Sequence, residues 1–505
     1  MKKLKKFISN CRNFVPPKIL TIILLIIMSL LVSFFTFNLD NDFWFLINLG
    51  ERILNEGFIT TDIFTIHSNL SFFPQQWLTD VIFYLIYSKF KVFGIYVLVM
   101  NINLIITFLI YKISMLISNN KVKLSLSVTI ITIIMLSIAF ITTRPQIFDI
   151  LLFLMEIYLL ELYIKRNNKL YLIGLPIISI LLINLHSSIW IMLFVILIPY
   201  YFDCLDKTKY FEKDKYGLIH LIIVTIIMFL LGFINPYKID AIKYLFTSYG
   251  IPEINSFIRE MQPAMITQMS GIYIFGYIFI VLVSYYYKRK IKLRYLLLFL
   301  GTSYLALSHV RGLLYLLVCG IPSLNYSFND IKEEIQEKYY HFKINNIIIA
   351  SFGLIFLISY GYFLINNRDI LEKNSKHYLG DIANYLDENA TKDIKLYTKY
   401  EDGAYLEYRG YKCYIDPRAE VFLKVNNKQE DIYLEYFALQ MGNYNYKEFL
   451  KKYEFDYLIV NHDDLLYNYI EDSDGYEIVY EENLNIGTYN KQDLSQYRIY
   501  KRVGN

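Results

Sequence analysis

Residues 19–44 read ILTIILLIIMSLLVSFFTFNLDNDFW, and this stretch shows what kind of chain it is. Its first part, Ile19–Phe37, is an apolar run without a charged residue. As a helix, the run is long enough to cross a hydrocarbon core of about 30 Å. Two carboxylates, Asp40 and Asp42, follow almost at once. The stretch therefore predicts a membrane-spanning helix that leads into an acidic segment at the membrane boundary.

The composition of the whole chain agrees with a membrane protein. Of its 505 residues, 55% are hydrophobic and 19% are charged, and the mean hydropathy is +0.34. A soluble domain of this length is ordinarily less apolar. The net charge of +4 is small, and the basic residues lie in short clusters beside apolar runs, as membrane topology requires. This pattern does not indicate a nucleic-acid partner.

Further apolar runs predict an all-α polytopic domain over residues 1–366 with about eleven spanning helices. The first span follows several N-terminal lysines and has no small-residue cleavage site before Asn38, which favours a retained anchor. The expected spans are 19–37, 94–117, 124–142, 147–164, 169–184, 187–203, 218–234, 270–287, 293–308, 312–327 and 345–366.

The segment Gln76–Phe90 is apolar but short, and its length alone leaves open whether it spans the membrane. The positive-inside tendency favours an interfacial position for it, because a span there would turn Lys288, Lys290 and Arg294 to the outside. We therefore expect a first outer loop over 38–93 with interfacial helices. The expected setting is a bacterial plasma membrane with a cytoplasmic N-terminus and an extracytoplasmic C-terminal domain.

From about residue 367 the pattern changes to short helices and strands, which predicts a small α/β domain over 367–505. This segment has no Gly-rich phosphate loop, nucleophile elbow or metal-binding spacing in its sequence, which favours a covering or acceptor-binding role. The expected strands are 395–400, 411–415, 456–460 and 497–502, and the expected helices are 380–388 and 446–453.

The first outer loop carries the densest set of motif residues. Asp40 and Asp42 could act as a general base on a hydroxyl or hold a divalent cation. For an isolated pair of this kind, a solvated stop to the preceding helix is the simpler explanation. The segments on either side of Gly57 have the pattern of interfacial helices, the second one opened by Pro74 and anchored by Trp77. Carboxylates held there could reach a lipid headgroup.

This loop resembles that of the GT-C membrane glycosyltransferases, a superfamily that includes protein mannosyltransferases and aminoarabinose transferases. The likeness is closer to uncharacterised bacterial members whose first loop has acidic, Trp, Gly, Asp-x-Phe and Trp-Leu positions in one order. The matching residues are Asp40, Asp42, Trp44, Gly50, Gly57, Asp62, Phe64, Thr65, Gln76, Trp77 and Leu78. One position departs from the pattern, because Leu46 stands where a His is frequent.

Later segments are also similar to that group, so the likeness covers nearly the whole chain. The membrane segments are Arg144-Pro145-Gln146, Asn184-Leu185-His186, Asn235-Pro236-Tyr237, Glu260-Met261-Gln262-Pro263 and His309-Val310-Arg311. The C-terminal segments are Asp402-Gly403-Ala404-Tyr405-Leu406 and Ile415-Asp416-Pro417-Arg418.

The resemblance implies a transferase that takes a sugar from a polyprenyl-phosphate lipid. Asp40 or Asp42 would then take the proton of the acceptor hydroxyl. Arg144, together with His309 and Arg311, would neutralise the charge on the departing phosphate. His186 and Glu260 are further candidates for binding the donor or its phosphate.

Several of these later residues also have a simpler interpretation. Arg144 at a span boundary could extend to water, and His186 could be a satisfied histidine between two helices. Glu260 is a candidate second carboxylate facing the cleft. Asp416 and Arg418 most simply form a structural pair.

Two other classes of function remain as alternatives. One is a transporter of a lipid-linked or anionic substrate, and the other is a non-catalytic assembly protein for surface polysaccharide, for which Leu46 is mild support. A divalent metal, Mg²⁺ or Mn²⁺, would be held by Asp40 and Asp42 if the enzyme uses one. Membrane lipids are expected partners. The sequence identifies neither the sugar nor the acceptor nor the oligomeric state.

Overall fold

The computed structural model describes residues 17–248, 251–288, 290–329, 355, 358–362, 366, 372, 376–470, 475–485 and 494–504. The chain divides into two compact units, each built from segments that are far apart in the sequence. The first unit contains Met1–Asn38, Val92–Ile242 and Asn255–Leu371. The second contains Leu39–Lys91, Lys243–Ile254 and Glu372–Asn505. The expected first outer loop thus folds with the C-terminal segment, and the domain boundary expected at 366/367 stays a prediction.

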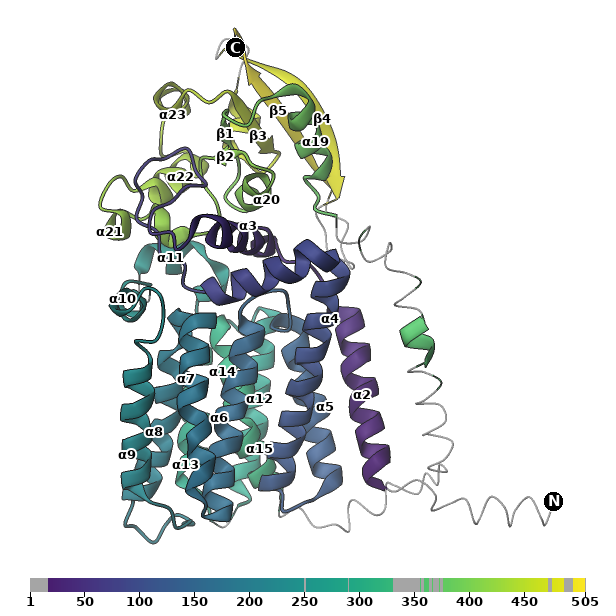
Figure 1. Ribbon diagram of the computed structural model, residues 1–505, viewed down its shortest axis with the longest axis vertical. Coiled ribbons are helices and arrows are strands. Elements are labelled where there is room, and N and C mark those ends of the chain that lie inside the picture. The colour runs from purple at the N-terminus through teal and green to yellow at the C-terminus, as the bar shows by residue number, and fades with distance from the viewer. Residues whose placement is uncertain are drawn as a thin grey trace, which may run out of the picture. The chain divides into compact units, whose positions relative to one another are not determined.

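The first unit is a bundle of helices that lie side by side (Figure 1). Helix α13 packs against α14 and α8, α6 packs against α7, and α5 packs against α2 and α15. The bundle helices are α2 (Pro17–Thr36), the part of α4 (Trp77–Ile117) that follows Lys91, α5 (Val122–Ala139), α6 (Gln146–Arg166), α7 (Gly174–Leu185), α8 (Ile191–Leu205), α9 (Leu218–Leu231), α12 (Met269–Tyr286), α13 (Leu293–Ser308), α14 (Leu313–Cys319) and α15 (Ile321–Phe328).

Helices occupy the expected span positions as far as the structure describes them. Five of the described helices are long and apolar enough to cross a membrane. Short 3-10 helices lie just before α7, α8 and α14, and they are η1 (Lys169–Ile173), η2 (Ser187–Ile189) and η4 (Val310–Gly312). A further one, η3 (Arg259–Met261), lies between α11 (Pro252–Phe257) and α12 in the chain. The expected span 345–366 falls mostly outside the described residues. The predicted polytopic helical class is confirmed, and the count of eleven stays a prediction.

The outer surface of the bundle remains apolar. On α9, for example, the side chains of Ile219, Ile223, Ile226 and Leu230 are all more than half exposed. A row of exposed branched side chains on a helix is costly in water and favourable in hydrocarbon. The packing of the unit therefore supports a membrane environment.

Helix α4 is broken at Lys91, where the backbone has φ 52° and ψ −149°. Its residues up to Lys91 belong to the second unit, and its residues from Val92 belong to the first. The break lies close to the start of the expected span at 94. It shows that Trp77–Phe90 is a helix separate from that span, as an interfacial segment requires.

The second unit contains a five-stranded sheet with the order β2-β1-β3-β5-β4. Its strands are β1 (Lys395–Tyr397), β2 (Lys412–Cys413), β3 (Tyr457–Asn461), β4 (Tyr476–Asn485) and β5 (Leu494–Arg502). Strands β2, β1 and β3 are parallel, with Leu396 beside both Cys413 and Tyr457. Strand β5 runs antiparallel to β3, and β4 and β5 form the long curved hairpin visible in Figure 1.

Helices of the first loop and of the C-terminal segment surround this sheet. Helix α3 (Asn41–Glu56) comes from the loop, and α19 (Gly380–Asn389), η5 (Ala419–Phe422), α20 (Gly403–Tyr408), α21 (Lys424–Asn427), α22 (Ile432–Gln440), α23 (Tyr446–Tyr453) and α24 (Leu465–Tyr469) come from the C-terminal segment. Two further helices, α10 (Ile239–Ser248) and α11 (Pro252–Phe257), have residues in both units.

Local sequence explains several of these elements. All five residues of β3 are buried, as expected for a parallel strand covered on both faces. Helix α23 has the predicted bounds because Asn445 caps its start and Glu454, with φ 52°, ends it. The predicted strand 395–400 stops at Tyr397, because the residues that follow lead into a turn before α20. Strand β4 was not among the predicted strands.

Candidate functional site

Asp40 and Asp42 lie at the start of α3. Asp40 is the N-cap residue of this helix, and its Oδ1 accepts a hydrogen bond of 3.1 Å from the backbone N–H of Asp42. Carboxylates are favoured at this end of a helix, because the first N–H groups are unpaired and the helix dipole is positive there. The pair is therefore part of the start of α3, and capping accounts for one oxygen of Asp40.

Helix α3 is held by close packing on two sides. At Gly50, an added Cβ would lie 2.2 Å from the backbone oxygen of Asp80 and 2.9 Å from Cβ of Tyr84, so only glycine fits. On another side the buried ring of Trp44 lies 5.0 Å from each of the rings of Tyr405 and Tyr408 in the C-terminal segment. Two motif positions of the first loop, Trp44 and Gly50, thus fix the helix that presents the acidic pair.

A buried ion cluster joins the first loop to the C-terminal segment. The Arg418 guanidinium contacts the Asp62 carboxylate at 2.7 Å through Nη1, and its Nε donates to both oxygens of Asp416 at 2.9 and 3.0 Å. Thr65 donates to the other oxygen of Asp62 through its hydroxyl, at 2.6 Å. The structural pairing of Asp416 with Arg418 is confirmed, and Asp62 is a third member that the sequence reasoning did not connect to it.

Aromatic rings surround the same guanidinium. The Arg418 Cζ lies 4.6 Å from the ring centroid of Phe45, 5.1 Å from that of Phe64 and 4.8 Å from that of Phe72. All three rings belong to the first loop, so the cation is recognised both by charge and by the faces of the rings. The Asp-x-Phe-Thr motif at 62–65 is therefore a binding surface for Arg418.

The charged groups in this cluster shift the pKa values of their neighbours. Burial acts to raise the pKa of Asp62, but the Arg418 charge and the bonds from Thr65 outweigh it and lower that pKa. Burial also raises the pKa of Glu407 well above its ordinary value, and the nearby Asp416 charge raises it further. The Arg418 guanidinium thus lies between the buried carboxylates of Asp62 and Asp416.

In the first unit, contacts connect most of the predicted motif segments. Arg144 forms an ion pair with Glu260 at 3.7 Å. The backbone N–H of Val310 donates to the carbonyl oxygen of Gln262 at 3.0 Å, so the segment with Glu260 lies beside the segment with His309 and Arg311. Four of the predicted residues, Arg144, Glu260, His309 and Arg311, are thus brought into adjoining segments at one end of the bundle.

His186 has a buried carboxylate partner. Its Nδ1 lies 2.8 Å from Oδ2 of Asp149, three residues into α6. Asn184 also donates to the carbonyl oxygen of Ile234 at 2.9 Å, which joins its segment to the one with Asn235. The geometry is that of a satisfied histidine between two helices, one of the two interpretations given above for His186.

Sequence reasoning missed the acidic residues inside α6. Asp149 pairs with His186, and Glu161 pairs with the fully buried Arg294 at 3.1 Å. Arg294 also contacts Asp203 at 3.1 Å, so the C-terminal end of α6 is fixed by ions. Glu156 lies between these ends, buried, with neither oxygen hydrogen-bonded in the described part of the chain. A carboxylate inside a spanning helix is costly and rare, and this signal could have drawn attention to all three residues.

The structure gives little support to the predicted metal site at Asp40 and Asp42. Among the described residues, no group of three or more His, Cys, Asp or Glu side chains converges to hold a metal ion. Asp40 and Asp42 provide two carboxylates, and Mg²⁺ is commonly bound by one or two carboxylates together with water and substrate phosphate. A metal ion held by Asp40 and Asp42 stays a prediction.

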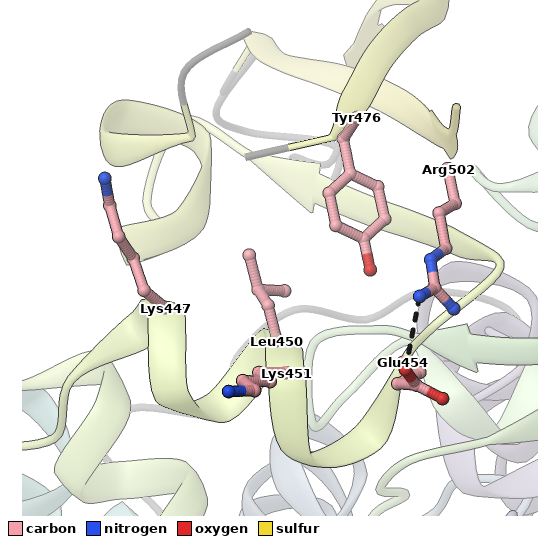
Figure 2. Close-up of a pocket in the computed structure, with 6 residues that line it drawn as sticks. All are labelled: Lys447, Leu450, Lys451, Glu454, Tyr476 and Arg502. Atoms are coloured by element: carbon pink, nitrogen blue, oxygen red, sulfur yellow. Dashed lines mark hydrogen bonds and ion pairs between the residues drawn. The ribbon is translucent and has the colours of Figure 1, made fainter. Parts of the chain in front are cut away.

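A pocket of about 170 Å³ lies between α23, β4 and β5 in the second unit. Figure 2 shows Leu450 and Tyr476 facing the same space, while Lys447 extends away from Tyr476. Arg502 at its edge is paired with Glu454 at 3.2 Å. The pocket thus presents an apolar wall and an already paired cation, and it shares no residue with the predicted site.

The arrangement of elements is shared with solved structures of an oligosaccharyltransferase from Archaeoglobus fulgidus, of which the apo form aligns with a TM-score of 0.58 at 11% identity, covering 87% of this chain and 69% of that chain. The same enzyme tethered to an acceptor peptide with the sequon NVT aligns with a TM-score of 0.57 at 11% identity, covering 87% of this chain and 69% of that chain. Its complex with zinc and sulfate aligns with a TM-score of 0.51 at 10% identity, covering 86% of this chain and 67% of that chain.

No family profile matches the sequence, and no curated protein is significantly similar to it. The structural likeness shows that the chain shares its fold with this oligosaccharyltransferase. Membership of the GT-C superfamily and the mannosyltransferase-like subtype stay predictions.

Proposed function

We propose that the chain is a membrane glycosyltransferase that takes a sugar from a polyprenyl-phosphate carrier and transfers it to an acceptor. The observation that carries the proposal is the likeness in fold to the archaeal oligosaccharyltransferase, which extends over 87% of the chain. An acidic pair on a tightly held helix can supply the general base that this transfer needs. The position of Asp40 and Asp42 on α3 therefore favours catalysis.

In the proposed reaction, the acceptor hydroxyl gives its proton to Asp40 or Asp42 while its oxygen attacks the anomeric carbon. The bond from that carbon to the phosphate oxygen breaks, and the electron pair leaves with the polyprenyl phosphate. Attack from the face opposite the leaving group predicts inversion at the anomeric carbon. Only the ionised carboxylate can accept the proton.

Cationic groups of the first unit are proposed to receive the leaving phosphate. Arg144, His309 and Arg311 lie in adjoining segments, and the pairing of Arg144 with Glu260 orients its guanidinium. Fixed cations of this kind stabilise charge that grows on a departing phosphate.

A divalent ion at Asp40 and Asp42, if one is bound, would supply positive charge near the donor phosphate. It is not required for the proton transfer described above. The archaeal oligosaccharyltransferase has been crystallised with zinc and sulfate. Adding EDTA to the transfer assay, and then restoring Mg²⁺ or Mn²⁺, separates a metal-dependent enzyme from a metal-independent one.

The deciding experiment uses purified protein in lipid with radiolabelled polyprenyl-phosphate sugars as donor. We expect release of the unlabelled carrier and transfer of the label, with a nucleotide sugar inactive as donor. Asp40→Asn and Asp42→Asn should each lower transfer by at least about a hundredfold, the usual range for loss of a general base. Asn also serves as an N-cap, so Asp40→Asn removes the charge and keeps the start of α3.

The alternatives give different results in the same assay. Binding of the lipid without release of carrier would indicate a non-catalytic assembly protein. Movement of intact lipid between leaflets would indicate a transporter. Full activity in both aspartate variants would show that the proposed mechanism is wrong. The proposed membrane setting, a bacterial plasma membrane with the C-terminal domain outside, is tested separately below.

A further inference from the structure

A histidine of the C-terminal segment makes a direct hydrogen bond to the residue between the two aspartates. His377 Nε2 lies 3.0 Å from Oδ1 of Asn41. Its other ring nitrogen, Nδ1, accepts a hydrogen bond of 3.2 Å from the backbone N–H of Leu379. Because Nδ1 accepts, Nε2 carries the proton of the neutral ring and donates it to Asn41. The two contacts together fix both the tautomer and the orientation of the ring.

Aromatic packing holds the same imidazole in place. Its ring is stacked on Tyr405, at 4.1 Å between centroids and 13° between planes, and on Tyr378, at 4.3 Å and 28°. The edge of Trp44 on α3 lies 6.1 Å away. Burial lowers the pKa of His377 to about 3, so the ring stays neutral throughout the physiological range. His377 is therefore a rigid neutral donor.

Asn41 is the first residue of α3 and is flanked by Asp40 and Asp42. The cap bond from Asp42 to Asp40 closes this turn from within, whereas the bond from His377 fixes it against the C-terminal segment. A turn at the end of a helix frays easily when its side chains have no outside partner. The His377–Asn41 contact thus limits the directions in which the two carboxylates can point.

We propose that His377 is a positioning residue that holds the Asp40–Asn41–Asp42 turn through its hydrogen bond to Asn41. This inference rests on the proposed function, because it assumes that the turn carries the catalytic carboxylates. It assigns the C-terminal segment a part in the reaction in addition to its packing. His377 itself exchanges no proton with the substrate.

The test compares His377→Phe with His377→Gln in the lipid-donor assay. Phe keeps the stacked ring and loses the donor, whereas Gln keeps an N–H donor at about the same reach. We expect His377→Phe to lower kcat about tenfold or more with the KM for the lipid donor unchanged, since small misplacements of reacting groups cost one to two orders of magnitude. Gln should restore kcat to within about threefold of the wild type.

A second variant tests the contact from the other side. Asn41→Ala leaves the aromatic stack intact, and it should lower kcat as much as His377→Phe does. Because both changes remove the same hydrogen bond, the double variant should lose no more activity than either single one. His462→Phe is the matched control, because His462 lies in the same unit with a half-exposed side chain and should give wild-type kinetics. If His377→Phe does not fold, Asn41→Ala alone decides.

The outcomes separate this inference from the proposed function. Wild-type kcat in a folded His377→Phe or Asn41→Ala protein, or losses that multiply in the double variant, would overturn the positioning role. Both would leave the transferase proposal standing, as long as Asp40→Asn and Asp42→Asn are inactive. An inactive wild type, or active aspartate variants, would instead refute the proposed function.

Discussion

Replacing Arg418 by Met tests the ion cluster that joins the first loop to the C-terminal segment. The change removes the cation between Asp62 and Asp416 and leaves two buried carboxylates without compensation. Breaking a buried ion pair by removing one partner costs about 3–5 kcal/mol. For a unit of roughly 200 residues, each kcal/mol lowers the melting temperature by about 2–4 °C, so we expect a decrease on the order of 10 °C at pH 7.

The decrease in melting temperature caused by Arg418→Met should become smaller as the pH falls. The pKa of Asp62 is lowered in the folded protein, so its contribution to stability is present above the ordinary carboxyl pKa near 4. That contribution disappears as the pH falls through the folded-state value. Without Arg418, burial favours the protonated carboxyl, and acid relieves the penalty. The difference in melting temperature between the wild type and Arg418→Met should therefore narrow from pH 7 toward pH 4.5.

The assay is thermal unfolding followed by tryptophan fluorescence in detergent, with Arg502→Met as the control. Arg502 pairs with Glu454 at 3.2 Å, but the two side chains are 38% and 58% exposed, and solvent-exposed pairs contribute about 0–1 kcal/mol. The control should melt within about 2 °C of the wild type. Arg418→Met melting equally close to the wild type, or a difference that widens in acid, would refute the reasoning.

Three other predictions follow from features described above. Gly50→Ala should destabilise the protein by roughly 1–3 kcal/mol, measured by the same melting assay, because the new Cβ would overlap the backbone oxygen of Asp80; an unchanged melting temperature would contradict the packing. A fluorescent-protein fusion after Lys123 should report a cytoplasmic location and an alkaline phosphatase fusion should be inactive there, whereas the reverse would overturn the predicted topology. Arg294→Met should also lower thermal stability by about 3–5 kcal/mol because it leaves Glu161 and Asp203 buried without their cation, and expression at wild-type stability would argue against that cluster.

The sequence predicted the features that depend on local pattern. Apolar runs located the bundle helices, because the length and composition of a run are properties of neighbouring residues. The bounds of α23 followed from its capping residues in the same way. Strand β4 was missed because Tyr476–Asn485 mixes polar and apolar residues, and it is a strand only because β5 pairs with it along its length.

The contacts that define the candidate site were harder to predict from the sequence. Asp62 and Arg418 were each singled out by motif order, but nothing local indicates that they touch, since pairing over such a distance depends on the fold. His377 was not noticed at all, because a lone histidine near a domain boundary has no motif around it. The acidic residues of α6 did carry a signal, since their cost inside a membrane predicts partners such as His186 and Arg294.

The sheet of the second unit is extended by the first loop, because Thr65 forms a parallel bridge with Cys413 and His67 lies 2.8 Å from the carbonyl oxygen of Tyr414. His67 and Tyr414 are 347 positions apart in the chain. At about 5–20 residues per second, a ribosome needs roughly 17–70 s to make the intervening segment. During that time the first loop has left the ribosome without the surface on which its aromatic residues are buried. The contacts of the first loop with this sheet can therefore form only after the segment around Cys413 and Tyr414 has been made.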